Sequence, residues 1–384
     1  KNSTRTANIN MDDQEIDSHH KAFAIIPKVG GTLSIIGCIL ILRDVSLKIK
    51  EHKTIPLTTK MMTLITVANL FLGFWENFLS TWMVPRDSLA FMASGNGTTC
   101  NLQAFISIFM YMIVETAYTM LSALYYITVA SKDWTTQKTQ SWTVLFTFLV
   151  LPIIIGLGTA VPLLVTQQYN FDGVYSCNIA TYPLDCYHND DIPCERAPHA
   201  VHIRDWLYMY VFVCFAVIII FLSMLLCNVK KQNAELAKHS EYYLQSIRGE
   251  GKNSNSVVFQ SLRYLIAFFI PNLALIFWAV SDNDSLVIQY LYVILWPLFG
   301  ALNSLVYFRL RYLNEQKNSP EATWTSLIGK TLAIPALIGR STGDETLPPL
   351  ISSLIDEDDL YSPLFEDEIA TGSISNYSPL PEFL

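Results

Sequence analysis

Seven stretches of about twenty residues, each nearly free of charge, recur along this chain. A helix of that length crosses the roughly 30 Å hydrocarbon core of a bilayer. Lipid cannot hydrogen-bond to the backbone, and membrane-spanning strands would be shorter and would alternate in polarity, so we expect helices. The predicted spans are residues 22–42, 61–84, 101–130, 142–165, 206–229, 257–280 and 287–308.

The composition favours a membrane protein over a soluble domain. Of the 384 residues, 51% are hydrophobic and 15% are charged, whereas soluble domains carry about 25% charged residues. The predicted fold class is an all-α membrane protein. We divide it into an N-terminal segment at 1–21, a seven-transmembrane helix bundle at 22–317 and a disordered tail at 318–384.

The positions of lysine and arginine predict how the bundle is oriented, because basic loops stay on the cytoplasmic side. The loops after the first, third and fifth spans are basic, as is the segment after the seventh. The opposite loops hold only Arg86, Arg196 and Arg204. We therefore expect a plasma-membrane protein with the N-terminus outside the cell and the C-terminus in the cytoplasm.

Four cysteines lie on the predicted outer side, where disulfides can form. Four cysteines allow three pairings. We favour Cys100 with Cys177, which ties the long loop 166–205 over the third span, and Cys186 with Cys194. A lone buried thiol at each position is the alternative.

Acceptor patterns for N-glycosylation at Asn2, Asn96 and Asn283 fall on the same outer side. They predict a glycoprotein. A fourth pattern at Asn376 falls on the inner side, which shows that such short triplets also occur by chance.

The segment after the last span changes character twice. Residues 309–317 (RLRYLNEQK) predict a short amphipathic eighth helix on the inner membrane face, with a solvated spacer as the alternative. Beyond them the chain becomes rich in Ser, Pro and acid, which predicts disorder. Ser319, Ser362 and Ser378 each precede proline. Phosphorylation there could recruit an arrestin-like or kinase partner. Chance repetition of Ser-Pro in a segment rich in both residues explains the pattern equally well.

Ionisable side chains inside spans are costly in lipid and therefore mark function. Glu115 lies midway along the third span with Tyr111 and Tyr118 nearby, and Glu76 lies in the outer half of the second. These four are the candidate ligand-binding residues. A structural hydrogen bond between helices is the alternative reading of Glu115. Lys28 in the first span can extend outward to the headgroups.

Two asparagines and several prolines indicate a conformational switch. Counting 1.5 Å per residue, Asn69 and Asn303 reach similar depths and could share a hydrogen-bonded cluster. Proline removes a backbone hydrogen bond and kinks a helix, as we expect at Pro271 in the sixth span and Pro297 in the seventh, where Gly300 follows. A kinked helix can swing, which a signal transmitter requires.

These features together resemble G-protein-coupled receptors. Cys100 heads the third span and faces Cys177, and Asn303-Ser-Leu-Val-Tyr307 followed by a basic segment is similar to the rhodopsin-like asparagine–tyrosine motif. The phrases ASGNGTTCNLQAF, LSALYYITVASKDW, CNIATYPLDC and FGALNSLVYFRLRYL resemble the branch found in diatoms and other protists, which is related to the cAMP-receptor-like group. The resemblance covers roughly residues 22–317.

The resemblance implies a receptor that passes an extracellular ligand signal to a heterotrimeric G protein when its sixth helix moves. It implies a switch made of Asn69, Phe269, Pro271, Asn303 and Tyr307. The candidate contacts with the G protein are Tyr125, Tyr126, Lys132, Lys230, Lys231 and Arg263. Tyr and Lys also collect at membrane boundaries as simple anchors.

The sequence departs from the rhodopsin-like pattern at three places. Ser304 replaces the motif proline, Asn69 stands where aspartate is usual, and the third span ends LYYITVASK without an acidic-Arg-Tyr triplet. Sodium regulation and the ionic lock of that family are therefore in question for this chain.

Three other functions compete with the receptor reading. An opsin needs a Schiff-base lysine in the seventh span, and residues 287–308 contain none. A membrane hydrolase needs metal ligands inside the bundle, and all 7 histidines lie in loops or termini. We therefore expect no enzyme activity, no metal, no cofactor and no nucleic-acid partner. A secondary transporter or channel is the retained alternative, and it predicts internal repeats, which we do not find among the spans.

Overall fold

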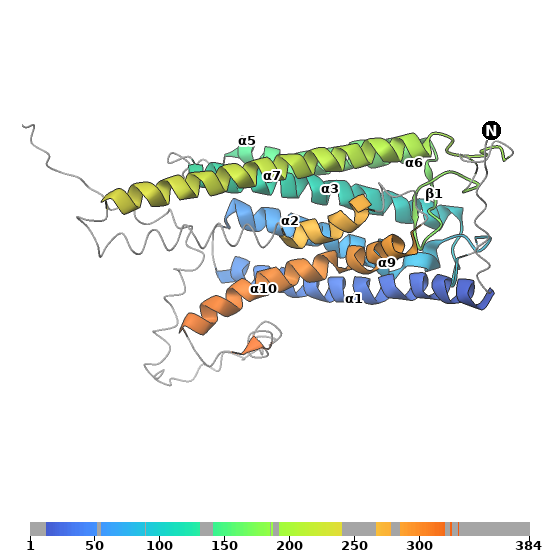
Figure 1. The fold of residues 1–384 in the computed structure, drawn as a ribbon, viewed down its shortest axis with the longest axis horizontal. Helices are drawn as coiled ribbons and strands as arrows, with labels where there is room; N and C mark the ends of the chain where they lie inside the picture. The colour runs from blue at the N-terminus through green and yellow to red at the C-terminus, as the bar shows by residue number, and fades with distance from the viewer. Residues whose placement is uncertain are drawn as a thin grey trace, which may run out of the picture.

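The chain forms an elongated bundle of helices that lie side by side (Figure 1). The computed structural model describes residues 13–51, 55–130 except 89, 141–239 except 185 and 187–191, 266–277, 285–318, and 323, 324 and 329. The long helices are α1 (Asp13–Glu51), α2 (Leu57–Leu72), α3 (Gly97–Ala130), α6 (Leu151–Val165), α7 (Ala200–His239), α9 (Leu286–Leu295) and α10 (Phe299–Asn318). A two-stranded antiparallel hairpin, β1 (Tyr169–Phe171) and β2 (Cys177–Ile179), caps one end.

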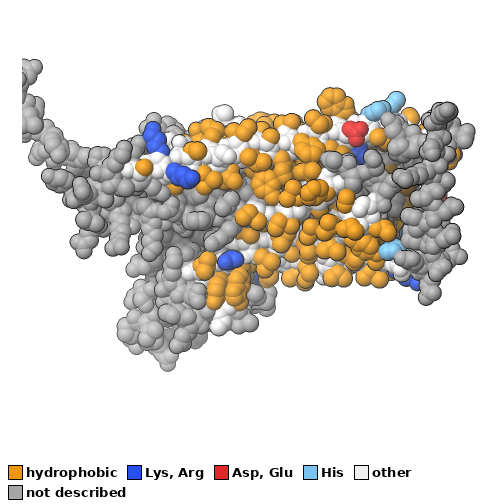
Figure 2. Space-filling view, viewed as in Figure 1, with side chains coloured by type: hydrophobic (Ala, Val, Ile, Leu, Met, Phe, Trp, Pro, Cys, Tyr) orange, Lys and Arg blue, Asp and Glu red, His pale blue; other side chains and the backbone are white. Residues whose placement is uncertain are grey.

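Six helical segments are long and apolar enough to cross a membrane, so this is a multi-pass helical membrane protein. They are Ser18–Lys50, Leu57–Phe78, Gly97–Thr128, Trp142–Val165, Ala200–Lys231 and Leu286–Leu313. Hydrophobic side chains cover the face shown in Figure 2. Six of the seven predicted spans are thus confirmed. The predicted span 257–280 is described only over Ile266–Phe277, a shorter apolar helix.

The two ends of the bundle differ in chemistry. We call the end that holds the Cys100–Cys177 bond and the hairpin the disulfide end. We call the opposite end, where Asp44 meets Tyr307 and Arg311, the Asp44 end. Both predicted disulfides, Cys100–Cys177 and Cys186–Cys194, are present.

The last described helix differs from the prediction of a separate eighth helix at 309–317. α10 runs without a break from Phe299 to Asn318. After Gly300 the helix contains no glycine or proline, so nothing in the backbone ends it where the apolar stretch stops. The ion pair between Arg311 and Asp44 also holds this part of α10 beside α1.

Three of the described spans contain irregular helix. In the fourth span a π-helix, η3 (Phe146–Val150), follows the short α5 (Trp142–Leu145). In the second and seventh spans the irregular turns pack against α1. In the second span α2 gives way to a π-helix, η1 (Gly73–Phe78), and then to a 3-10 turn, η2 (Ser80–Met83). In the seventh span a 3-10 turn, η4 (Trp296–Leu298), separates α9 from α10 and contains Pro297. Single π turns inside α-helices are frequent at functional sites.

Polar side chains of α1 form hydrogen bonds with backbone N–H and C=O groups at these irregular turns. Ser34 Oγ donates to the carbonyl of Pro297 (2.7 Å) and accepts from Ala301 N (3.2 Å). An unbroken α-helix joins these two backbone groups directly. Lys28 Nζ donates to the carbonyl of Leu79 (3.3 Å). Lys28 therefore serves the end of η1 and does not simply extend outward to the headgroups.

Close packing against both irregular turns depends on glycines of α1. A Cβ at Gly30 would lie 2.7 Å from Pro297 Cβ. A Cβ at Gly31 would lie 2.8 Å from the Gly73 carbonyl oxygen and 2.9 Å from Phe78 N. Small residues let backbones approach in lipid, where association depends on packing. The glycines thus set the distance between α1 and the second and seventh spans.

We predict that Gly31→Ala lowers the free energy of unfolding by about 1–3 kcal/mol, because the added methyl group meets backbone atoms of η1 that cannot rotate away. The matched control is Gly158→Ala on α6, where an added Cβ has nothing within 4 Å. Alanine there should leave stability unchanged or raise it slightly. Thermal unfolding of the purified variants measures both, and equal midpoints would contradict the packing argument.

Candidate ligand cavity and helix switch

A cavity of about 50 Å³ lies at the disulfide end, between η1, α3, the hairpin, α7, the Ile266–Phe277 helix and the seventh span. A water molecule needs roughly 10–15 Å³ of such volume, so the cavity admits several waters or a small head group. Its charged lining residues are Glu76, Asp172 and Arg204. Its aromatic lining residues are Tyr111, Tyr208, Tyr292 and Trp296.

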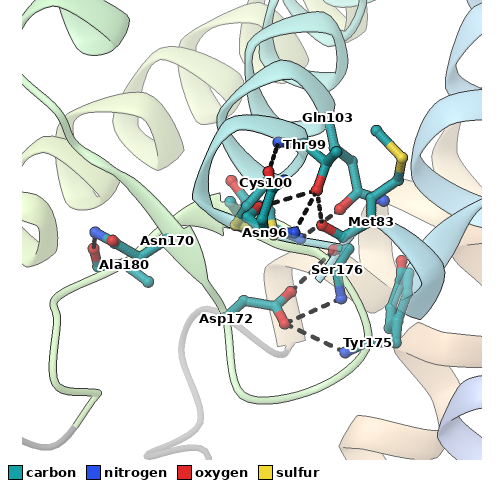
Figure 3. The surroundings of a disulfide bond; sticks show 12 residues. Met83, Asn96, Thr99, Cys100, Gln103, Asn170, Asp172, Tyr175, Ser176 and Ala180 are labelled. Atoms are coloured by element: carbon teal, nitrogen blue, oxygen red, sulfur yellow. Dashed lines mark hydrogen bonds between the residues drawn. A yellow bond between two sulfur atoms is a disulfide. The ribbon is translucent and has the colours of Figure 1, made fainter. Parts of the chain in front are cut away.

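The hairpin covers the cavity and is fixed to α3 by more than the disulfide (Figure 3). The buried side chain of Gln103 accepts from Cys177 N (2.9 Å) and donates to the carbonyls of Trp75 (2.9 Å) and Ser80 (3.0 Å). One amide therefore joins α3, the hairpin and the irregular part of the second span. Removing it would leave several buried backbone groups without partners.

Asp172 shapes the turn between the two strands. Its Oδ1 accepts from the backbone N–H groups of Val174 (2.9 Å), Tyr175 (3.2 Å) and Ser176 (3.3 Å), and Oδ2 accepts from Ser176 Oγ (3.1 Å) (Figure 3). Burial raises the pKa of Asp172 above its ordinary value, while these hydrogen bonds act in the opposite direction. The carboxyl is thus a structural centre of the turn as well as a wall of the cavity.

The π turn brings Glu76 into the interior. Glu76 is 3% exposed, and its Oε1 accepts from Trp296 Nε1 at 2.9 Å. Tyr111 packs edge-on against the same indole, with ring centroids 5.2 Å apart. A carboxylate buried in the bundle therefore contacts the first residue of η4, so the cavity wall and the irregular turn of the seventh span share one hydrogen bond.

Two hydroxyl groups on neighbouring turns of α3 line the cavity without partners. Ser107 Oγ and Tyr111 Oη are buried, and neither has a hydrogen-bond partner among the described residues. Ser107 lies near Glu76, and Tyr111 lies near Glu115, but neither meets its neighbour in hydrogen-bond geometry. Buried hydroxyls normally have a partner, so these two leave unsatisfied polar groups in the cavity wall.

The four predicted ligand-binding residues divide into two groups. Glu76 and Tyr111 line the cavity, whereas Glu115 and Tyr118 are not among its lining residues. Glu115 is fully buried, and neither of its carboxylate oxygens has a hydrogen-bond partner among the described residues. Its nearest polar neighbours are Asn272 and Tyr111.

Two of the predicted switch residues, Phe269 and Pro271, lie on the Ile266–Phe277 helix beside an aromatic cluster. Phe268 is fully buried at its centre, with ring centroids 4.5 Å from Tyr118, 5.3 Å from Phe215 and 5.9 Å from Phe299. The predicted Phe269 lies beside it, against Phe215 at 4.8 Å. Pro271, one turn further along this helix, is buried.

Asn69 and Asn303 do not share a direct hydrogen bond. Asn303 Oδ1 accepts from Tyr118 Oη at 2.6 Å. Asn69 lines a small second cavity of about 10 Å³ together with Ser34 and Pro297. Asn69 Oδ1 and Asn303 Nδ2 both lack a partner among the described residues. Asn303 is therefore joined to Tyr118 of the third span and not directly to Asn69 of the second.

Asp44 is a buried, charged residue of the candidate site that the sequence argument missed. It is 1% exposed. Its Oδ2 accepts from Tyr307 Oη at 2.5 Å and lies 3.2 Å from Lys48 Nζ, and its Oδ1 pairs with Arg311. Tyr307 and Arg311 are one turn apart on α10, as Asp44 and Lys48 are on α1. The available signal was one acid within the otherwise basic boundary LRDVSLKIK.

The remaining predicted residues lie at the surface or outside the described part of the chain. Tyr126 packs on Phe221 of α7 at 5.8 Å, Tyr125 is half-buried, and Lys230 and Lys231 are exposed. Asn96 is exposed and its Oδ1 caps α3 through Thr99 N at 3.0 Å (Figure 3). The candidates outside the described residues are Asn2, Lys132, Arg263, Asn283 and the tail beyond 329.

No protein-family model matches the chain, and a search of curated proteins finds no similar sequence. Within the described residues, no cluster of three or more His, Cys, Asp or Glu side chains could hold a metal ion.

We predict that Asp172 makes the protein relatively more stable in acid. Its raised folded-state pKa means that the folded protein binds this proton more tightly than the unfolded chain. The contribution is complete below the ordinary aspartate pKa of about 4, and it is lost as the pH rises through the raised value. Asp172→Asn removes it and keeps an acceptor oxygen for the turn.

The thermal midpoint of the wild type, minus that of Asp172→Asn, should therefore fall as the pH rises from about 4. The matched control is Asp87→Asn, at an exposed position of the same end. A difference that stays constant or grows with pH would show that burial does not dominate at Asp172.

Proposed function

We propose that this protein is a G-protein-coupled receptor of the plasma membrane, with the disulfide end outside the cell and the Asp44 end in the cytoplasm. The observation that carries the proposal is a continuous series of contacts that joins the cavity to the Asp44 end. Disulfides favour the outer side for the hairpin, and the basic boundary around Asp44 favours the inner side.

The outer half of this series runs through aromatic rings. The Trp296 indole, bound to Glu76 in the cavity, lies 6.1 Å from the Phe299 ring. Phe299 in turn lies 5.9 Å from Phe268 and 6.0 Å from Tyr118. Tightly packed rings change position together, since a core of this kind has few voids to absorb a shift.

The inner half of the series runs along α10. Tyr118 donates to Asn303 at 2.6 Å, and Tyr307 follows Asn303 one turn later and donates to Asp44. Asp44 also holds Arg311 and Lys48. A displacement of η4 at the cavity would therefore be passed along α10 to the charged cluster at Asp44, which holds α10 against α1.

The Asp44 cluster supports the proposal because it joins α1 to α10 by contacts that would have to break if α10 moved away. Buried charges are stable when paired, and losing one partner of a buried pair costs about 3–5 kcal/mol. The cluster therefore holds α10 against α1 until a larger change in the bundle separates them. Release would expose basic side chains of α10 at the surface where a G protein would bind.

The primary experiment reconstitutes the full chain in nanodiscs with purified heterotrimeric G proteins. Nucleotide exchange on the G protein is measured across a panel of compounds. The proposal requires exchange above the empty-nanodisc rate with at least one G protein. Uptake of labelled solute into vesicles, without any stimulation of exchange, would instead support the transporter alternative.

We predict that Asn303→Ala lowers stimulated exchange at least about tenfold, because the buried Tyr118 hydroxyl loses its acceptor at a cost of roughly 1–3 kcal/mol. Pro271→Ala should lower it in the same direction by straightening the Ile266–Phe277 helix. Leu305→Ala is the control. Leu305 lies on α10, as Asn303 does, but its side chain is 59% exposed, so the variant should retain exchange. Surface expression is measured in parallel. Normal exchange in both variants would remove these residues from the switch.

We predict that Asp44→Asn raises basal exchange several-fold, because Arg311 and Lys48 lose the charge that fastens α10 to α1. Asp205→Asn, at an exposed position on α7, is the control. Thermal stability separates the two possible roles. A lower midpoint with unchanged or lower basal exchange would show that Asp44 only supports the fold.

A further inference from the structure

We infer that the cavity at the disulfide end binds a small organic cation, namely an ammonium head group, with Glu76 as its counter-ion. This deepens the proposed receptor function and rests on it for its physiological meaning. The binding itself stands on the geometry of the cavity and is tested separately.

The first argument is charge. Among the described lining residues, two are acidic, Glu76 and Asp172, and one, Arg204, is basic. Both oxygens of Asp172 are occupied by hydrogen bonds from the hairpin turn. Glu76 has one oxygen occupied by the Trp296 indole. An anionic ligand would meet an excess of negative charge at low dielectric, whereas a cation would neutralise it.

The second argument is the pair of hydroxyls on α3. Ser107 Oγ and Tyr111 Oη are buried in the cavity wall without partners among the described residues. Both can accept hydrogen bonds from an ammonium N–H. Ser107 lies near Glu76 and Tyr111 lines the same cavity, so the wall offers a donor three acceptors from two helices. This observation is independent of the count of charges.

The third argument is the aromatic wall. Tyr111 stands edge-on to Trp296 at 5.2 Å, and Tyr292 stacks on Trp296 at 6.0 Å. Aromatic rings together with a carboxylate form the kind of enclosure that recognises alkylammonium groups, because the ring faces are negative. With about 50 Å³ available and roughly 10–15 Å³ for each water-sized group, a head group with a few heavy atoms fits.

A cation bound to Glu76 would affect the seventh span, because Glu76 accepts a hydrogen bond from Trp296. A cation on Glu76 competes with the Trp296 N–H for the same carboxylate. Trp296 begins η4, so a weaker indole bond loosens the turn that separates α9 from α10. The ligand thus favours the conformation in which this bond is broken, which is the difference in affinity that a ligand needs to shift a population.

The test uses the full chain in nanodiscs and measures the thermal midpoint against increasing tetramethylammonium or methylammonium chloride. Sodium chloride at equal ionic strength and sodium acetate are the comparison salts. We expect a saturable rise with one or both ammonium salts, as linkage requires for a ligand of the folded state, and none with acetate. Glu76→Gln should raise the apparent Kd at least about tenfold, since it removes the charge that pairs with the ligand.

Glu76→Gln keeps an oxygen for the Trp296 indole, so the fold should survive. Ser107→Ala is the second variant and should weaken methylammonium binding several-fold by removing one acceptor for its N–H groups. Glu195→Gln, at an exposed position of the same end, is the control and should bind as the wild type. The absence of a saturable rise with either ammonium salt, or equal affinity in wild type and Glu76→Gln, would overturn the inference.

Nucleotide exchange on a G protein, measured on the same samples, separates this inference from the proposed function. Ammonium binding that depends on Glu76 without any exchange would retain the site and reject the receptor. Exchange driven by other compounds, with Glu76→Gln unaffected, would retain the receptor and reject the ammonium site.

Discussion

Lipid supplies no hydrogen-bond partner to the backbone, and this constraint governs where the bundle can depart from regular helix. The second and seventh spans each contain an irregular turn, and polar side chains from neighbouring helices satisfy both. Ser34 serves η4, Lys28 serves the end of η1, and Gln103 binds the carbonyls of Trp75 and Ser80. In these two spans the irregular geometry therefore occurs where other helices support it.

This supported irregularity is what creates the functional geometry. The π turn at Gly73–Phe78 brings Glu76 into the bundle, and the 3-10 turn at Trp296–Leu298 places an indole against it. A regular helix at either place would rotate one of these side chains away from the other. The residues proposed to bind the ligand and the turns proposed to move are therefore neighbours.

The sequence predicted six described spans and both disulfides. It also singled out Glu76 and Tyr111, which line the cavity. These follow from length, compartment and the cost of charge in lipid, which are properties of single segments. The sequence could not predict that Asp44 pairs with Tyr307 and Arg311, or that Trp296 binds Glu76. Those pairs join residues more than 200 positions apart, and helix packing alone decides them. The predicted break before residue 309 failed because polarity changes there while helix propensity does not.

The central claim is that the cavity and the Asp44 end are mechanically coupled. It is tested most directly by the distance between spin labels at positions 50 and 309, which are exposed on α1 and α10. The exposed Cys227 is first replaced by serine, and distances are recorded with wild-type Trp296 and with Trp296→Phe, which cannot donate to Glu76. The account predicts that this change near the cavity increases the population with a longer distance at the Asp44 end. An identical distance distribution in the two proteins would contradict it.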